Sequence, residues 1–263
     1  MENTVLSAKS SGQWTGYELE VLNISIEEVD APDFLGSALR DPQTDPILLA
    51  HSVLLSNETH PAGPISRENG RFFRYLQDVA RFADGPFTEM AITDFCACLL
   101  QLLDYDEPEC VVHRYDELDM IMCGERVNTT SNVVVMDDDQ NHLLLLQVDL
   151  PDAEAEPQLI AAAIAAYYHS NRHRQQLGLP TVKAKVFPGI VMTGSAPTFY
   201  LIPVSEALEA AVRRGQYPSE PTVVKKLRPT VNDMREYLEK GMESLANRQL
   251  IFQLLGAFKQ FLQ

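Results

Sequence analysis

The fold is decided by residues 131–151, SNVVVMDDDQNHLLLLQVDLP, together with residues 156–171, EPQLIAAAIAAYYHSN. The β-branched and apolar runs at 132–136 and 143–150 are typical of strands, and the acidic turn residues between them predict a hairpin. The second segment is rich in strong helix formers, follows acidic residues suited to a helix N-terminus, and is stopped by Gly178 and Pro180. The order strand, turn, strand, long helix is therefore expected.

The flanking sequence adds elements on both sides. Strand-like runs are CVVHRY at 110–115, MIMC at 120–123, VFPGIVMTG at 186–194 and TFYLIPV at 198–204, and helical patterns cover 46–56, 65–83, 88–103, 205–214 and the C-terminal tail. Strands follow one another through turns instead of alternating with helices. This order favours an α/β or α+β core with a mixed sheet and one central crossover helix over a doubly wound nucleotide-binding fold.

The charge of the chain disfavours nucleic acid as a partner. The 263 residues carry 21 Lys and Arg against 37 Asp and Glu, which gives a formal net charge of −16. Such a surface repels phosphate backbones at long range. No apolar run approaches the roughly 20 residues needed to span a bilayer, and no signal-peptide pattern is present. We expect an intracellular protein, cytoplasmic or nuclear, without membrane association.

Common catalytic and metal-binding motifs are missing from the sequence. There is no glycine-rich phosphate loop, no HExxH and no GxSxG. The four cysteines lack the spacings that hold zinc. Asp137, Asp138 and Asp139 are interpreted as a solvated turn, Ser195 as part of a turn between strands, and the basic residues at 172–174 as a complement to the helix dipole. We predict neither a metal site nor a cofactor.

Short segments in a fixed order carry a resemblance to a known family. They are CGE at 123–125, LLLLQ at 143–147, EPQLI at 156–160, AIAAY at 163–167, PGI at 188–190, PTFY at 197–200 and NR at 247–248. In these segments, from about Phe87 to the C-terminus, the chain resembles basidiomycete fungal proteins with the PD-(D/E)XK, restriction-endonuclease-like architecture. The resemblance implies a mixed central sheet flanked by helices over residues 86–263. Before it, the Ser, Gly, Asp and Pro content of the first 40 residues and the helical patterns that follow predict an N-terminal arm and helical extension at 1–85.

The resemblance also implies a nuclease centre, with an aspartate on one hairpin strand and a Gln-Glu-Asp-Lys run on the next. Carboxylates there would hold Mg²⁺, and a lysine would stabilise developing negative charge. This chain has Asn132 at the aspartate position, Val148 at the glutamate position and Leu150 at the lysine position. Asp149 does not replace them, because alternate side chains of a strand point to opposite faces. The metal site is therefore expected to be dismantled.

The remaining polar groups form a candidate cleft. The full set of candidate residues is Glu125, Arg126, Asn128, Asn132, Gln147, Val148, Asp149, Leu150, Gln158 and Tyr167. A structural interpretation competes with it, in which Gln158 bonds locally in the first helical turn and Glu125 pairs with Arg126.

Three functions remain open from the sequence. The first is a non-cleaving, nuclease-like module that binds a protein partner. The second is a repurposed, metal-independent enzyme that acts on a small or apolar metabolite in the former cleft, and it requires residues 125, 132, 148 and 150 to line an open cavity. The third, nucleic-acid binding without cleavage, requires residues 169–174 and 183–185 to form one basic face.

Overall fold

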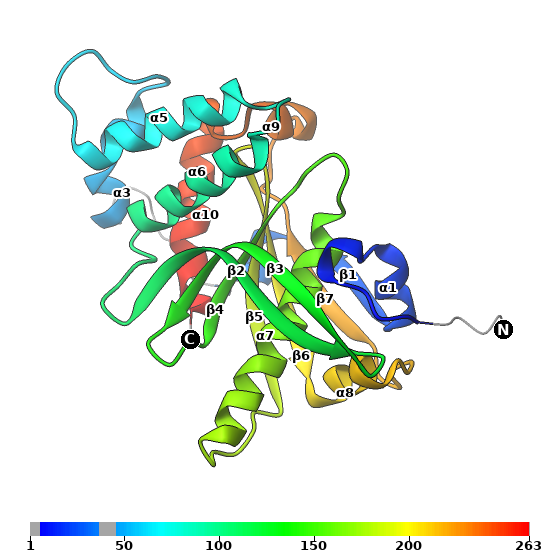
Figure 1. Cartoon of the computed structure of the whole chain (residues 1–263). Coiled ribbons are helices and arrows are strands. Elements are labelled where there is room, and N and C mark those ends of the chain that lie inside the picture. The colour runs from blue at the N-terminus through cyan, green and yellow to red at the C-terminus, as the bar shows by residue number, and fades with distance from the viewer. Residues whose placement is uncertain (1–5, 37–45, 263) are drawn as a thin grey trace.

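A seven-stranded, mostly antiparallel sheet with helices on both faces organises the protein in the computed structural model, which describes residues 6–36 and 46–262 (Figure 1). The strands are β1 (Ile24–Glu28), β2 (Cys110–Met122), β3 (Glu125–Asp137), β4 (His142–Val148), β5 (Ala184–Thr193), β6 (Ala196–Ser205) and β7 (Thr222–Leu227). Their order across the sheet is β1-β7-β6-β5-β4-β3-β2. The predicted α+β class is confirmed.

Helices precede, interrupt and follow the strands. The α-helices are α1 (Gly16–Val21), α2 (Ala31–Leu35), α3 (Pro46–Ala50), α4 (Ser52–Ser56), α5 (Arg67–Arg81), α6 (Thr88–Leu102), α7 (Ala155–Gln176), α8 (Glu206–Arg214), α9 (Met234–Lys240) and α10 (Leu245–Phe258), and the short 3-10 helices are η1 (Ser11–Gln13), η3 (Gly241–Glu243) and η4 (Lys259–Phe261). The predicted helix at 46–56 is divided in two at His51.

The predicted hairpin and crossover are present. β3 and β4 pair antiparallel, with Val133 opposite Leu146, and residues 138–139 form the turn between them. α7 then carries the chain over the sheet to β5, which lies parallel to β4 with Leu145 opposite Gly189. A parallel pair needs such a crossover, because a short turn can only join antiparallel strands. β4, α7 and β5 are therefore the central unit of the fold.

The described part of the N-terminal segment packs into the same body. β1 pairs parallel with β7, with Ile26 opposite Val224, and Trp14 and Leu22 are at most 1% exposed. Neither β1 nor β7 was anticipated from the sequence. The division of the chain at residue 85 stays a prediction, and residues 1–5 and 37–45 of this segment lie outside the described residues.

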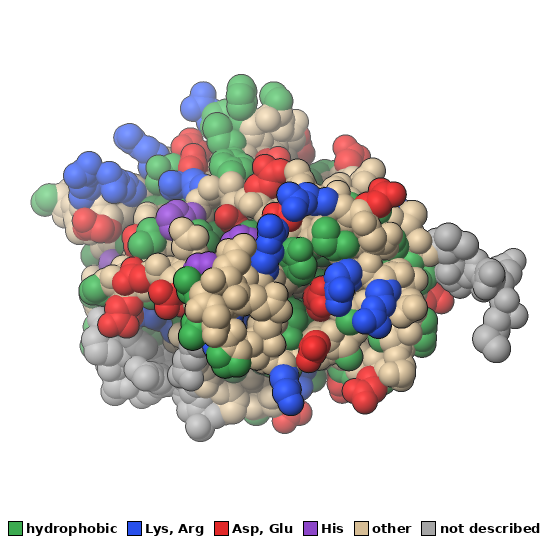
Figure 2. Space-filling model, turned by 60° about the horizontal axis from the view of Figure 1, so that its bottom comes forward, with side chains coloured by type: hydrophobic (Ala, Val, Ile, Leu, Met, Phe, Trp, Pro, Cys, Tyr) green, Lys and Arg blue, Asp and Glu red, His purple; other side chains and the backbone are tan. Residues whose placement is uncertain are grey.

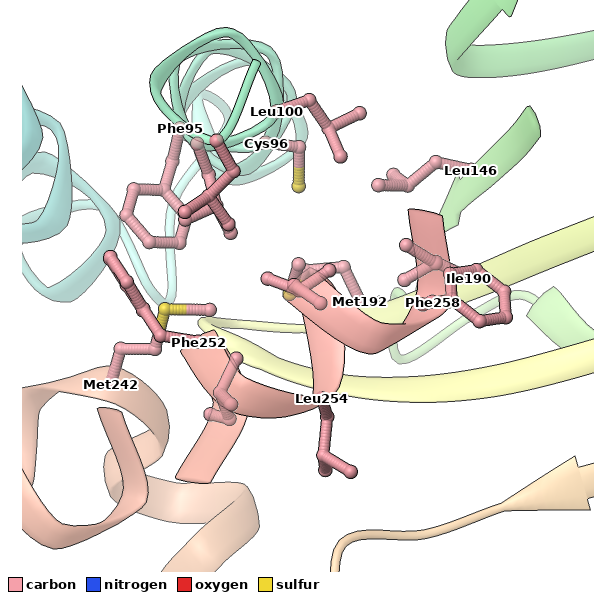
Figure 3. Close-up of a cluster of buried hydrophobic side chains, with 14 of the residues drawn as sticks. Phe95, Cys96, Leu100, Leu146, Ile190, Met192, Met242, Phe252, Leu254 and Phe258 are labelled. Carbon is pink, nitrogen blue, oxygen red and sulfur yellow. The ribbon is translucent and has the colours of Figure 1, made fainter. Parts of the chain in front are cut away.

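Two apolar clusters lie on opposite faces of the sheet. The first joins α5, α6 and α10 to alternate residues of β3, β4 and β5, and the second joins α7 and α8 to the residues between them. In the first cluster, Phe95 and Cys96 from α6 and Phe252 from α10 approach Met192 of β5 (Figure 3). Full burial of side chains such as these contributes about 1.5–3 kcal/mol each. These clusters hold the two helical layers on the sheet.

The long β2–β3 hairpin changes faces along its length. Val112 of β2 packs against the first cluster, whereas Leu118 and Met120 belong to the second. Even-numbered residues would share one face in a regular strand. Between them, Tyr115 has a left-handed φ of 56°. The alternation reverses at this residue, so that the two halves of β2 pack against different layers.

Candidate functional site

Asn132 and Val148, which occupy the positions of the expected metal ligands, are closed off from solvent. Asn132 on β3 is 5% exposed and Val148 at the end of β4 is 2% exposed. The Asn132 Oδ1 atom accepts a hydrogen bond of 2.8 Å from the Val148 backbone N–H, and its Nδ2 group donates one of 2.8 Å to Glu89 Oε1 on α6. The Val148 side chain belongs to the first apolar cluster. The amide of Asn132 thus links two strands and a helix.

The next two residues, Asp149 and Leu150, point to opposite sides as the strand pattern predicts. Leu150 packs against the first apolar cluster with Val148. On the other face, Gln147 Nε2 donates a 2.9 Å hydrogen bond to Gln158 Oε1 of α7. Asp149 Oδ2 accepts a 2.9 Å hydrogen bond from Thr193 Oγ1 at the end of β5. Gln158 therefore bonds across to the sheet and not only within its helix.

Glu125, Arg126 and Asn128 do not belong to this cleft, which corrects the sequence-based expectation. They lie at the other end of β3, paired with the end of β2. Glu125 and Asn132 are seven residues apart in an extended strand, which corresponds to about 23 Å at 3.3 Å per residue. Arg126 does not pair with Glu125 but has its Nε 3.4 Å from Asp119 Oδ2, and Asn128 bonds to Glu117.

Tyr167 also lies apart from the cleft. It is buried in α7 and its hydroxyl donates a 2.6 Å hydrogen bond to the Val182 carbonyl. Burial raises the pKa of the Tyr167 phenol, and the nearby carboxylates of α8 act in the same direction. The residue lines a separate cavity of about 490 Å³ with Arg172 and Arg213. The ten candidate residues thus divide into one group around Asp149 and two groups elsewhere.

A groove runs past Asp149 and is formed by two adjoining cavities. Their volumes are about 340 and 660 Å³, and both are lined by Asp149, Ala153, Thr193 and Leu238. We call their combined lining the Asp149 groove. The metal-independent enzyme hypothesis requires residues 125, 132, 148 and 150 to line an open cavity. Of these four, only Leu150 lines the groove, because Glu125 is distant and Asn132 and Val148 are buried. The groove adjoins Asn132 and Val148 without opening onto them.

The smaller cavity of the groove contains a charged cluster that the sequence did not reveal. Glu156 on α7 accepts hydrogen bonds at the same Oε1 atom from Lys226 Nζ of β7 and from the Tyr200 hydroxyl of β6. Lys226 is 8% exposed and Tyr200 is 1% exposed. Burial raises the pKa of Tyr200, and the charge of Glu156 and its hydrogen bond raise it further. The consecutive β-branched residues Thr222, Val223 and Val224 were the available signal for this strand.

Three further observations concern metal ligands, helix length and surface charge in the described part of the chain. They contain no group of three or more His, Cys, Asp or Glu side chains arranged to hold a metal ion. No helix within the described ranges has the length and apolar character needed to cross a membrane. On the face drawn in Figure 2, Lys and Arg side chains lie among Asp and Glu and do not form one continuous basic surface.

Comparison with known proteins adds no family assignment. No family model matches the chain, and no curated protein matches it. The likeness to PD-(D/E)XK proteins therefore rests on the sequence segments alone, and the structure supports the coarser α+β class.

Proposed function

We propose that this protein is a degenerate PD-(D/E)XK nuclease-like module that does not cleave nucleic acid and acts by binding a partner, most simply another protein. The observation that carries the proposal is the closed arrangement of Asn132 and Val148. A hydrolytic metal centre needs carboxylate oxygens that face an open position for water and phosphate. Here an amide with both ends hydrogen-bonded and a buried valine stand at those positions.

Several further properties support a binding role. The formal charge of −16 opposes the approach of polyphosphate and favours basic partners. Filling the site with apolar residues removes the free energy needed to bury unpaired charges, so a scaffold released from metal binding gains stability. The four cysteines are free thiols, which fits the proposed intracellular location in a reducing compartment.

A nuclease assay tests the proposal directly. The purified full chain is incubated with duplex DNA, single-stranded DNA and RNA in the presence of Mg²⁺ or Mn²⁺. We expect no cleavage above a metal-free control, and no change with Asp149→Ala. Metal-dependent cleavage that Asp149→Ala abolishes, while the exposed control variant Glu125→Ala retains it, would overturn the proposal.

A second function is favoured by the Lys226–Glu156–Tyr200 cluster. A buried lysine and tyrosine on one carboxylate, beside Asp149 in a cavity of about 340 Å³, are polar groups that converge where they can bind and orient a small substrate. This arrangement suits a metal-independent enzyme that acts on a small metabolite. A thermal-shift panel of metabolites tests it, because a ligand of the native state raises its stability. We expect Lys226→Met and Tyr200→Phe to abolish any shift that arises from this cavity.

A further inference from the structure

The larger cavity of the Asp149 groove combines an apolar lining with carboxylates. Its apolar residues come from four parts of the chain: Val79, Ala80 and Ala83 from α5 and the turn after it, Ile92 from α6, Leu150, Pro151 and Ala153 after β4, and Leu238 from α9. Its charged residues are Asp149, Glu239 and Glu243, and no Lys or Arg is among the described residues that line it. The cavity of about 660 Å³ thus offers a low-polarity surface bordered by one sign of charge.

The rim residues on α9 and η3 are available to a partner. Leu238 is 42% exposed and lines both cavities, so an apolar side chain lies at the point where they meet. Among the described residues Glu243 forms no ion pair and Glu239 pairs with the exposed Arg235 of its own helix. The exposed Lys240, which is paired with Glu236, is the other nearby cation, and the charges of Glu239 and Glu243 help to raise its pKa. Exposed pairs of this kind contribute little and are easily exchanged for another cation.

The lining of the smaller cavity also carries more carboxylates than cationic side chains. Lys226 forms an ion pair with Glu156, and the Arg228 Nη1 atom lies 3.6 Å from Glu28 Oε2. Glu154 adds a further carboxylate to the lining. The acid-rich character therefore extends along the groove, in the same sense as the charge of the whole chain. Both the local and the overall field attract a cation.

We propose that the Asp149 groove binds a segment of another protein in which a lysine or arginine lies next to a large apolar side chain. The inference rests on the proposed binding function and specifies the chemistry of the partner. The apolar side chain occupies the surface formed by Leu150, Pro151 and Leu238, where it is removed from water. The cationic side chain lies against Glu239 and Glu243 at the rim, where charge complementarity directs association and orientation.

Selection from a random peptide library displayed on phage tests this inference with the full-length protein as bait. Peptides enriched by the wild-type chain are synthesised, and their dissociation constants are measured by fluorescence anisotropy. We expect a shared pattern of Lys or Arg beside Leu, Ile or Phe. The affinity is expected to fall about tenfold between 50 and 500 mM salt, because rim ion pairs are screened.

Matched variants separate the groove from the general charge of the protein. The double variant Glu239→Lys and Glu243→Lys is expected to weaken peptide binding about tenfold or more, whereas Glu125→Lys, an exposed change at the far end of β3, leaves it within twofold. Leu238→Ser is expected to weaken binding, and Leu177→Ser, an exposed leucine outside the groove, is its control. Circular dichroism verifies that each variant is folded.

The inference fails if no peptide is enriched, if the enriched peptides lack a cationic residue, or if Glu125→Lys weakens binding as much as the groove variants do. These results leave the proposed function standing when the nuclease assay stays negative, because another surface would then carry the partner. Metal-dependent cleavage would instead overturn the proposed function, whatever peptides are selected. The two failures are therefore distinguishable.

Discussion

Restoring the missing carboxylate with Asn132→Asp should destabilise the protein without restoring a metal site. The substitution keeps an acceptor for the Val148 N–H but replaces the Nδ2 donor with an oxygen that faces Glu89. Loss of that hydrogen bond costs about 1 kcal/mol, and burying a carboxylate with one donor costs about 1–3 kcal/mol. We expect a destabilisation of about 3 kcal/mol, which corresponds to about 9 °C in melting temperature for a domain of this size.

The effect should depend on pH in a defined direction. Burial and the neighbouring Glu89 raise the folded-state pKa of the new carboxyl above its value in the unfolded chain. A carboxyl whose pKa is raised on folding destabilises the folded state increasingly as pH rises above the unfolded-state value. Calorimetry of Asn132→Asp should therefore show a small loss near pH 4 and the full loss at pH 7.

A second substitution provides the control. Glu89→Gln supplies a side-chain amide that can donate to the new carboxylate. The double variant should recover about half of the lost stability, whereas Glu89→Gln alone should change little because Glu89 is exposed. The reasoning is refuted if Asn132→Asp leaves the melting temperature unchanged, or if Mg²⁺ raises the melting temperature of this variant by several degrees.

Two other substitutions test the packing around the site. Gly241→Ala should destabilise the protein by about 3 kcal/mol in a urea titration, because Gly241 has a φ of +46° and an added Cβ would overlap Ser195 Oγ. The control Gly12→Ala should be near neutral in the same titration, because Gly12 has open space around it and an ordinary backbone conformation. Arg248→Met should also cost about 3 kcal/mol in urea unfolding, because the fully buried guanidinium donates to the carbonyls of Leu54, Asn57 and Glu58. A loss no larger than that of the exposed control Arg235→Met would contradict this role.

The central unit of the fold could be predicted because its signals are local. The β3–β4 hairpin has apolar runs on either side of Asp138 and Asp139, and α7 has alanine-rich sequence with acidic residues before it. β1 and β7 could not be predicted in the same way. They pair residues about 200 positions apart, such as Ile24 with Thr222, and each is a run of five or six residues that includes charged side chains. Their pairing depends on tertiary contacts that no local pattern contains.

The candidate site was predictable only where strand alternation applied. Val148 and Leu150 share a face while Asp149 points to the other, as the period of two requires. Grouping Glu125, Arg126 and Asn128 with Asn132 was wrong because all four residues lie on one extended strand, in which residues several positions apart in sequence are also far apart in space. The Lys226–Glu156–Tyr200 cluster was missed because its members lie on three elements brought together by the crossover and the unpredicted β7.

The reversal of faces at Tyr115 has a consequence for how the protein unfolds. One half of β2 packs against the layer that contains α5 and α6, and the other half packs against the layer that contains α7. Separating either helical layer from the sheet therefore exposes part of a hairpin whose other part is still buried. Because β2 contributes to both layers, the opening of one layer is coupled to the opening of the other. The sheet and both helical layers should therefore lose structure as a single cooperative unit.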